Sequence, residues 1–456
     1  MKVLVQKFGG TSVATDEARA AAADKVARAV AGGWRVVVVV SAIGRAGAPY
    51  ATDTLIETLR KIDPSVPPAP RELDMMMACG EILSTVVMAQ TLRARDLDTI
   101  ALTGGQAGIL TDYEFGNARI LSIDPTYVAK MLEIGKVVLV AGFQGVTELG
   151  AVTTLGRGGS DTSASALAAS LKEYAREIAV EIYTDVSGVK TADPRLVPDA
   201  RTLSRATYGV VAEMAHQGAK VVHPRAAELA DRYDLPLWIK NTFDDEPGTL
   251  ITRDAPRSER PLGMTGITHA GKLVYLRFAM PDEGDDSSRG QVELEIYRIL
   301  QREGISIHLT STGGTTFAFA VARENLPRLR ELIDGLIVPV DLGVRRKPPF
   351  GKIFLLGIGA GRGYKAQSAL LARAEKFVEV HGIEAEVIES VTLVSAVAED
   401  LDGLSGALVR LLETLDRAGI PVYQTADSRY SVSALIPEAQ AEKATRALHD
   451  EFGLAK

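Results

Sequence analysis

Short apolar runs alternate with amphipathic segments along the first 250 residues of this chain. The runs at residues 3–8 and 35–41, the second with five consecutive valines, are typical of strands buried on both faces. Further strands are predicted at residues 98–102, 137–141, 178–184 and 236–240, and helices at 15–31, 73–92, 163–172, 208–216 and 225–233. This alternation predicts an α/β fold with a largely parallel sheet and helices on both faces.

The pattern changes beyond residues 242–261, a segment rich in proline, glycine and charge that we interpret as a domain junction. The order strand, helix, strand, strand then occurs twice, at 273–278, 291–302, 306–310 and 316–322, and at 392–397, 404–418, 421–425 and 431–436. The phrases REGISIHLTS and RAGIPVYQTA occupy equivalent places in the two copies. We therefore interpret this half as an internal repeat.

Between the copies, residues 351–377 are predicted to form a strand, a glycine loop and a helix. A dinucleotide-binding motif would need a third glycine where Arg362 stands, and no complete strand–helix–strand unit follows with a well-placed acid. An extra strand and helix is the favoured interpretation.

Composition narrows the class of protein. A length of 456 residues fits two or three domains, and 46% hydrophobic with 24% charged residues is ordinary for a soluble chain. The net charge of −7 argues against a nucleic-acid partner. The chain starts directly with a predicted strand, without a signal peptide, and no apolar stretch reaches the ~20 residues of a membrane span. We expect a cytoplasmic protein that binds neither membrane nor nucleic acid.

The single cysteine, Cys79, rules out an internal disulfide framework and fits a reducing compartment. Its apolar helical surroundings favour a buried, inert thiol. The six histidines are scattered, and no Cys/His spacing resembles a zinc site. No metal site built from protein ligands is predicted.

Three clusters rich in glycine, hydroxyl groups and charge each follow an apolar run. They are KFGGTSV at 7–13, TTLGRGGSDTSA at 153–164 and YTDVSGVKTADPR at 183–195. The carboxyl ends of strands are where open α/β sheets bind ligands. Glycine lets a backbone approach a phosphate closely, and lysine or arginine offsets its charge. The clusters together predict an enzyme that uses a nucleotide for phosphoryl transfer.

These clusters, with VSAIGR…PYATDTL at 40–55, CGE at 79–81 and GAKVVHPRA at 218–226, resemble the aspartate kinases. That resemblance implies the amino-acid kinase fold, a three-layer α/β/α structure around a largely parallel sheet. The repeat resembles tandem ACT domains, ferredoxin-like α+β sensors of small ligands. The expected divisions are a catalytic domain at 1–250, a linker at 251–262, ACT-like domains at 263–350 and 391–456, and an atypical strand–helix segment at 351–390.

The resemblance implies ATP-dependent phosphorylation of the side-chain carboxylate of L-aspartate, with Mg²⁺, to give 4-phospho-L-aspartate. This is the first step towards lysine, threonine and methionine. It also implies a homodimer or higher oligomer and an amino-acid effector, lysine or threonine. The turns at 280–290 and 398–406 depart from the family pattern, yet the intact repeat favours a retained sensor over a module that only dimerises. Two alternatives remain open: a kinase for another acidic substrate, and a weakly catalytic effector-binding regulator.

The nucleophile of such a reaction is already ionised at neutral pH, because an aspartate side chain has a pKa near ~3.9. The site must therefore supply positioning and charge offset, and it needs no strong base. The catalytic candidates are Lys7 at the transferring phosphoryl, Asp161 to orient lysine or hold Mg²⁺, and Lys220 at the phosphates. Asp161 is also a candidate N-cap for the helix predicted from residue 163.

Substrate and nucleotide contacts follow from the same resemblance. Arg157 suits a carboxylate because guanidinium binds it with two parallel hydrogen bonds. Glu81, inside an apolar helix, needs a partner, and the amino group of aspartate would supply it. The remaining substrate candidates are Ser41, Arg119 and Ser160, and the nucleotide candidates are Lys7, Phe8, Gly9, Gly10, Thr184, Asp185, Lys190, Asp193, Arg195 and Lys220.

Three alternatives stay open within these motifs. Thr11 and Ser12 suit a phosphate contact and a helix cap equally well. Asp193, before a proline, is equally a turn residue. His223, also before a proline, is more consistent with packing than with catalysis.

Overall fold

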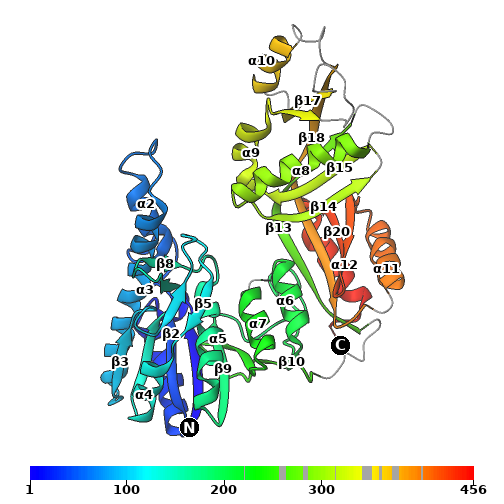
Figure 1. Ribbon diagram of the computed structural model, residues 1–456. Coiled ribbons are helices and arrows are strands. Elements are labelled where there is room, and N and C mark those ends of the chain that lie inside the picture. Colours follow the sequence, from blue (N-terminus) through cyan, green and yellow to red (C-terminus); the bar gives the residue numbers. More distant parts are fainter. Residues whose placement is uncertain are drawn as a thin grey trace.

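The structure is a computed structural model that describes residues 1–219, 221–255, 263–280, 286–313, 315–340, 352–358, 362–371, 379–401 and 404–455. Figure 1 shows an N-terminal α/β domain, blue to green, beside a C-terminal region, green to red. The short helices α6 and α7 lie between the main body of the first domain and the second region.

An eight-stranded sheet forms the centre of the N-terminal domain, in the order β10-β12-β11-β9-β1-β2-β6-β3. All neighbours are parallel except β11 and β12. The strands are β1 (Lys2–Phe8), β2 (Arg35–Val40), β3 (Thr99–Leu102), β6 (Val137–Ala141), β9 (Glu177–Thr184), β10 (Arg205–Ala206), β11 (Leu237–Asn241) and β12 (Thr249–Ile251). The predicted, largely parallel sheet is confirmed.

Both faces of this sheet are covered, which explains the unbroken valines of β2. Val37 and Val39 belong to the core cluster on the α4 and α5 side, whereas Val36, Val38 and Val40 pack on the side of α1 and α3. The helices are α1 (Asp16–Ala31), α2 (Thr52–Arg60), α3 (Pro70–Arg93), α4 (Thr126–Glu133), α5 (Gly159–Leu171), α6 (Tyr208–His216) and α7 (Pro224–Arg232). Side chains of a strand alternate between its faces, so a strand covered on both sides is apolar throughout.

A second, four-stranded sheet stands at one end of this domain, in the order β5-β4-β7-β8. It comprises β4 (Ile109–Thr111), β5 (Ile120–Ile123), β7 (Gln144–Val146) and β8 (Val152–Thr154). This sheet was not predicted from the sequence, because each of its strands is only three or four residues long. The glycine cluster at 153–164 therefore begins in this small sheet and not at the end of β6.

The C-terminal region is built on an antiparallel and mixed sheet in the order β14-β15-β13-β18-β17-β16, with β20 also paired to β18 and β19 to β20. Its strands are β13 (Met264–Ala279), β14 (Ile307–Gly313), β15 (Thr316–Ala322), β16 (Ile337–Val340), β17 (Lys352–Ile358), β18 (Glu379–Ala398), β19 (Gln424–Asp427) and β20 (Ser431–Pro437). Its helices are α8 (Asp286–Arg302), α9 (Leu326–Ile333), α10 (Arg362–Leu371), α11 (Leu404–Arg417) and α12 (Ala441–Glu451).

The two repeat copies share strands β13 and β18. The first half of β13 pairs with the last part of β18, which lies between β13 and β20, whereas the second half of β13 lies beside β15. Segment 351–377 contributes the extra strand β17 and helix α10, as expected; its glycine turn at 359–361 lies outside the described residues, as do 281–285 and 402–403 of the two variant turns. Strand β18 runs without a break across residues 390 and 391, where a domain boundary is expected from the sequence, and that boundary remains a prediction.

Helix α3 bears on two expectations and corrects one of them. By length and mean hydropathy it is apolar enough to span a membrane, but half of its most apolar window is buried inside the protein, as in a core helix. Cys79 is exposed, so the interpretation of a buried thiol is wrong. The helix turns Met77, Ala78 and Glu81 inward, and with them Gly80, while Cys79 falls on the opposite side.

Candidate active site

Lys7 and Asp161 form a buried ion pair at the centre of the site. Lys7 lies one residue from the carboxyl end of β1, and its Nζ is 2.6 Å from Oδ1 of Asp161. The two residues are only 9% and 8% exposed. The second oxygen of Asp161 accepts a hydrogen bond from the backbone N–H of His223, at 3.2 Å. The carboxylate thus ties α5, β1 and the start of α7 together and holds one ammonium group at the strand end.

The amino end of α5 lies beside this pair. Gly158 is its N-cap, in the left-handed conformation at φ 70°, and a Cβ there would stand 2.2 Å from the imidazole of His223. Only glycine fits, and the packing role expected for His223 agrees with this contact. The helix begins at Gly159, so the expected N-cap role of Asp161 is wrong: Asp161 lies in the first turn and is free to pair with Lys7. The N–H groups of Gly159 and Asp161 donate to the carbonyls of Gly156 and Gly158, at 3.0 and 3.1 Å, so this end of α5 favours an anion mainly through the positive end of the helix dipole.

The turn after β1 lies close to its neighbours. A Cβ on Gly10 would stand 2.5 Å from the carbonyl oxygen of Gly44, whose N–H donates to the Gly10 carbonyl at 3.1 Å. Phe8 is fully buried and stacks on Tyr183 with ring centres 4.8 Å apart, so only its backbone is available to a nucleotide. Gly9 donates to the Tyr183 carbonyl at 3.4 Å, which joins this turn to the end of β9.

Ser12 has a structural role. Its hydroxyl is fully buried and lies 2.7 Å from the hydroxyl of Thr242, itself 1% exposed. A hydroxyl group this enclosed does not face a ligand, so Ser12 is not a phosphate contact.

Glu81 is a buried carboxylate with one unused oxygen. Its Oε1 accepts from the N–H of Ala42 at 3.1 Å, next to Ser41, and Oε2 has no hydrogen-bond partner among the described residues. The residue is 3% exposed, and burial raises the pKa of its carboxyl to about 8. A buried carboxylate of this kind is stabilised by a cationic partner. The geometry suits a ligand ammonium group.

Arg119 and Arg157 are exposed, and neither forms an ion pair within the part of the chain described. Arg119 ends the hairpin of residues 112–119, where its N–H donates to the Asp112 carboxylate at 3.0 Å. Arg157 lies between two glycines of positive φ. The N–H of Ala118 donates to the Thr154 carbonyl at 2.8 Å, which brings the two arginine-bearing segments together. Two unpaired guanidinium groups on adjoining segments suit a carboxylate ligand.

Several of the nucleotide candidates form contacts within the protein. The Thr184 hydroxyl accepts from the N–H of Val186 at 3.0 Å, and Asp185 pairs with Arg45 at 2.8 Å. The Asp193 carboxylate accepts from Arg195 at 2.6 Å, and this lowers its pKa, as turn chemistry would predict. The Lys190 ammonium donates to the Thr202 hydroxyl at 3.0 Å. Lys220 lies outside the described residues.

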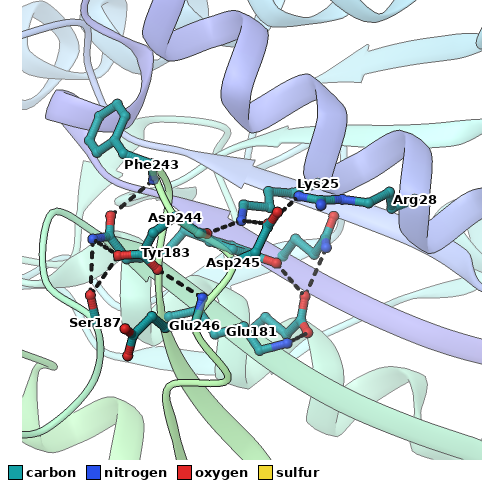
Figure 2. Close-up of polar contacts among 12 residues, drawn as sticks. Lys25, Arg28, Glu181, Tyr183, Ser187, Phe243, Asp244, Asp245 and Glu246 are labelled. Atoms are coloured by element: carbon teal, nitrogen blue, oxygen red, sulfur yellow. Dashed lines mark hydrogen bonds and ion pairs between the residues drawn. The ribbon is translucent and has the colours of Figure 1, made fainter. Parts of the chain in front are cut away.

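A segment that sequence reasoning missed, residues 241–246, braces the nucleotide side. Figure 2 shows Asp244 accepting from the Ser187 hydroxyl, at 2.7 Å, while the Asn241 amide donates to the same oxygen at 2.6 Å. Asp245 pairs with Lys25 and Arg28 of α1, each at 2.8 Å. The loop that follows β9 is thus anchored to α1, and no motif in the sequence marked these acids.

Beneath this segment lies a cavity of about 320 Å³ on the face of the sheet opposite to Lys7. Its charged lining is internally paired: Glu181 accepts from Gln6 at 2.8 Å, Tyr183 at 3.0 Å and Lys240 at 2.6 Å. Glu181 is buried, and these three donors satisfy its carboxylate. We assign this cluster a structural role.

Comparisons with known proteins agree on one relationship. The model of the amino acid kinase family matches residues 2–241, and that of an ACT domain matches residues 386–450. Aspartokinase 1 of Bacillus subtilis (strain 168) is 35% identical over 463 residues, covering 100% of both chains. The aspartokinase of Geobacillus stearothermophilus is 33% identical over 461 residues, covering 100% of this chain and 98% of the relative.

Among solved structures, E. coli aspartokinase III in complex with aspartate and ADP, in its R-state, has a similar fold. The TM-score is 0.70 at 26% identity, and the match covers 99% of this chain and 100% of that one.

Proposed function

We propose that this chain, which belongs to the aspartokinase family, transfers the γ-phosphoryl group of Mg·ATP to L-aspartate at the Lys7–Asp161 pair. The amino-acid kinase domain and the C-terminal ACT region expected from the sequence agree with this membership. The observation that carries the assignment is the 2.6 Å pair itself, at a strand end beside the amino terminus of α5.

The site mainly has to offset the negative charge of the transferring phosphoryl group, because the substrate carboxylate is already a nucleophile at neutral pH. In the proposed reaction one carboxylate oxygen of aspartate bonds to the γ-phosphorus, and the bond from that phosphorus to the bridging oxygen of ADP breaks. The Lys7 ammonium and the positive amino end of the α5 dipole, near Ser160, offset the charge on the transferring group. Asp161 positions Lys7 and takes no proton.

Aspartate would be held at both ends. The unused Oε2 of Glu81 would accept a hydrogen bond from the ammonium group of the substrate, and Arg119 and Arg157 would bind carboxylate oxygens of the substrate. Ser41 lies one residue from Ala42, which donates to Glu81, and would face the same substrate. A longer acidic substrate would carry its side-chain carboxylate further from the ammonium group held by Glu81, which favours aspartate over the alternative of another acidic amino acid.

ATP would lie over the turn of Gly9 and Gly10 and the end of β9, where Thr184 and Asp185 stand. The E. coli relative binds ADP, which supports ATP as the donor here. Within the described residues, no group of three or more His, Cys, Asp or Glu side chains could hold a metal ion. Mg²⁺ commonly reaches a kinase on the phosphates with few protein ligands, so the site fits Mg·ATP as substrate.

We further propose cytoplasmic homo-oligomers regulated by lysine, with threonine as second choice. The two domains are in direct polar contact: Oε1 of Glu213 in α6 accepts from the hydroxyls of Ser428, at 2.9 Å, and Ser431. Ser395 of β18 donates to Gln217 at 3.0 Å. An effector that binds the ACT region in one arrangement would shift the kinase domain through such contacts. A thermal shift with millimolar lysine, threonine or meso-diaminopimelate tests this; no shift and no inhibition would leave the region as an assembly module.

The catalytic assignment is tested by ADP release with aspartate and other acidic amino acids. Lys7→Ala should lower turnover ~100-fold or more, as loss of one preorganised donor does, while the aspartate KM changes little. Lys2→Ala is the matched control, because Lys2 lies on the same strand and pairs with Glu177 at an exposed position. Turnover of Lys7→Ala within a few-fold of the wild type would overturn the role of Lys7. Aspartate-independent ADP release would favour the alternative of a weakly catalytic regulator.

A further inference from the structure

Asp74 is a buried carboxylate that the reaction above leaves unused. It lies in α3, seven residues before Glu81, and is completely inaccessible to solvent. Seven residues are close to two helical turns, so both acids point to the same side of α3. Within the described chain no cation pairs with Asp74, and burial raises the pKa of its carboxyl.

Three hydrogen bonds offset the burial of this carboxylate. Oδ2 accepts from the N–H of Thr154 at 2.7 Å and from the N–H of Gly116 at 3.0 Å. Oδ1 accepts from the Thr154 hydroxyl at 2.8 Å. An unpaired buried carboxylate is costly even with such partners, so an apolar residue would serve better if simple packing were required.

The two anchored segments are those that carry the arginines. Arg119 follows Gly116 by three residues, and Arg157 follows Thr154 by three residues. The segments also meet directly, since Ala118 donates to the Thr154 carbonyl. Asp74 therefore hydrogen-bonds both arginine-bearing segments to the helix that carries Glu81.

We propose that Asp74 is a positioning residue for aspartate binding. It holds Gly116 and Thr154 on α3 and thereby sets the separation between the two guanidinium groups and the Glu81 carboxylate. This inference rests on the proposed function, because it assumes that the arginines bind substrate carboxylate and that Glu81 binds its ammonium group. The nucleotide side makes no contact with Asp74 among the hydrogen bonds described, and ATP binding should be independent of it.

The test is Asp74→Asn, which keeps the shape but replaces one carboxylate oxygen with an NH2 group, so that either the two backbone N–H groups or the Thr154 hydroxyl lose their acceptor. We expect the aspartate KM to rise about tenfold or more, since a displacement near 1 Å can cost that much, while kcat and the ATP KM stay within about threefold. Glu72→Gln is the matched control, because Glu72 is an exposed acid on the same helix and should leave all three constants unchanged. Thr154→Val removes only the bond to Oδ1 and should raise the aspartate KM about threefold.

The outcomes distinguish a failure of this inference from a failure of the proposed function on which it rests. If both Asp74→Asn and Thr154→Val keep the aspartate KM within twofold, Asp74 positions nothing. If Asp74→Asn alters kcat and both KM values by one common factor, its role is general folding and the proposal is overturned. If it does not fold, the Thr154→Val result decides alone. Arg157→Ala tests the proposed function on which this inference rests. An unchanged aspartate KM in this variant would refute the assignment of the arginines to substrate binding, and this inference with it.

Discussion

Aspartate binding should strengthen as the pH rises from 6 to 8, because Glu81 must lose a proton before it can receive an ammonium group. Burial raises the pKa of Glu81 to about 8 from its ordinary 4.5 in the free protein. The protonated form is thus favoured by folding, and its contribution to stability is complete below pH 4.5 and lost as the pH rises through 8. Substrate reverses this preference by pairing with the carboxylate.

The size of the effect follows from the fraction of Glu81 that is ionised. With a pKa of about 8, roughly one molecule in 100 carries the carboxylate at pH 6 and about half do at pH 8. The apparent affinity for aspartate should therefore improve by about 50-fold across this range. At pH 7, binding should release close to one proton for each aspartate bound.

Isothermal titration calorimetry in buffers of different ionisation enthalpy measures both affinity and proton release. Glu81→Gln is the matched variant, since it keeps the shape of the side chain and titrates nowhere in this range. It should bind aspartate more weakly at pH 8, lose the Glu81-linked pH dependence, and discriminate less against succinate, which lacks the amino group. Parallel pH profiles for the two proteins would refute the reasoning and make Glu81 a structural residue.

Three other outcomes are expected. Gly158→Ala should lower the free energy of unfolding in urea by roughly 2 kcal/mol or more, because its Cβ would overlap the His223 ring. Gly150→Ala, at φ 77° with open space around it, should lower it by roughly 1 kcal/mol. Equal losses of stability would contradict the packing at Gly158. Ser187→Ala should raise the ATP KM about threefold and leave the aspartate KM unchanged, because only the hydrogen bonds of the Ser187 hydroxyl to Asp244 and Asn241 are lost. The reverse pattern would contradict the proposed place of the nucleotide. Deletion beyond residue 261 should abolish end-product inhibition and disrupt assembly, as activity assays and sedimentation would report; an inhibited, assembled fragment would contradict this.

The sequence alone was enough to predict the largely parallel sheet and helices α1, α3, α5, α6 and α7, but not α2 or α4. Val36–Val40 can only be a strand covered on both faces, and Lys7, Gly9 and Gly10 directly follow a strand of the same kind. Such conclusions are available because periodicity and turn residues report on structure within a few residues. The repeat was visible for the same reason, since each copy has its own local pattern.

What only the tertiary structure decided are the relationships between residues far apart in the chain. Lys7 and Asp161 meet across more than 150 residues, and Asp74 reaches Gly116 and Thr154 from a helix whose pattern shows only an apolar face. The side of α3 that turns outward, with Cys79 on it, depends on which strands it covers. The sharing of β13 and β18 depends likewise on strand order. A local pattern states that a face must be buried, but the partner that buries it is chosen by the packing of the whole chain.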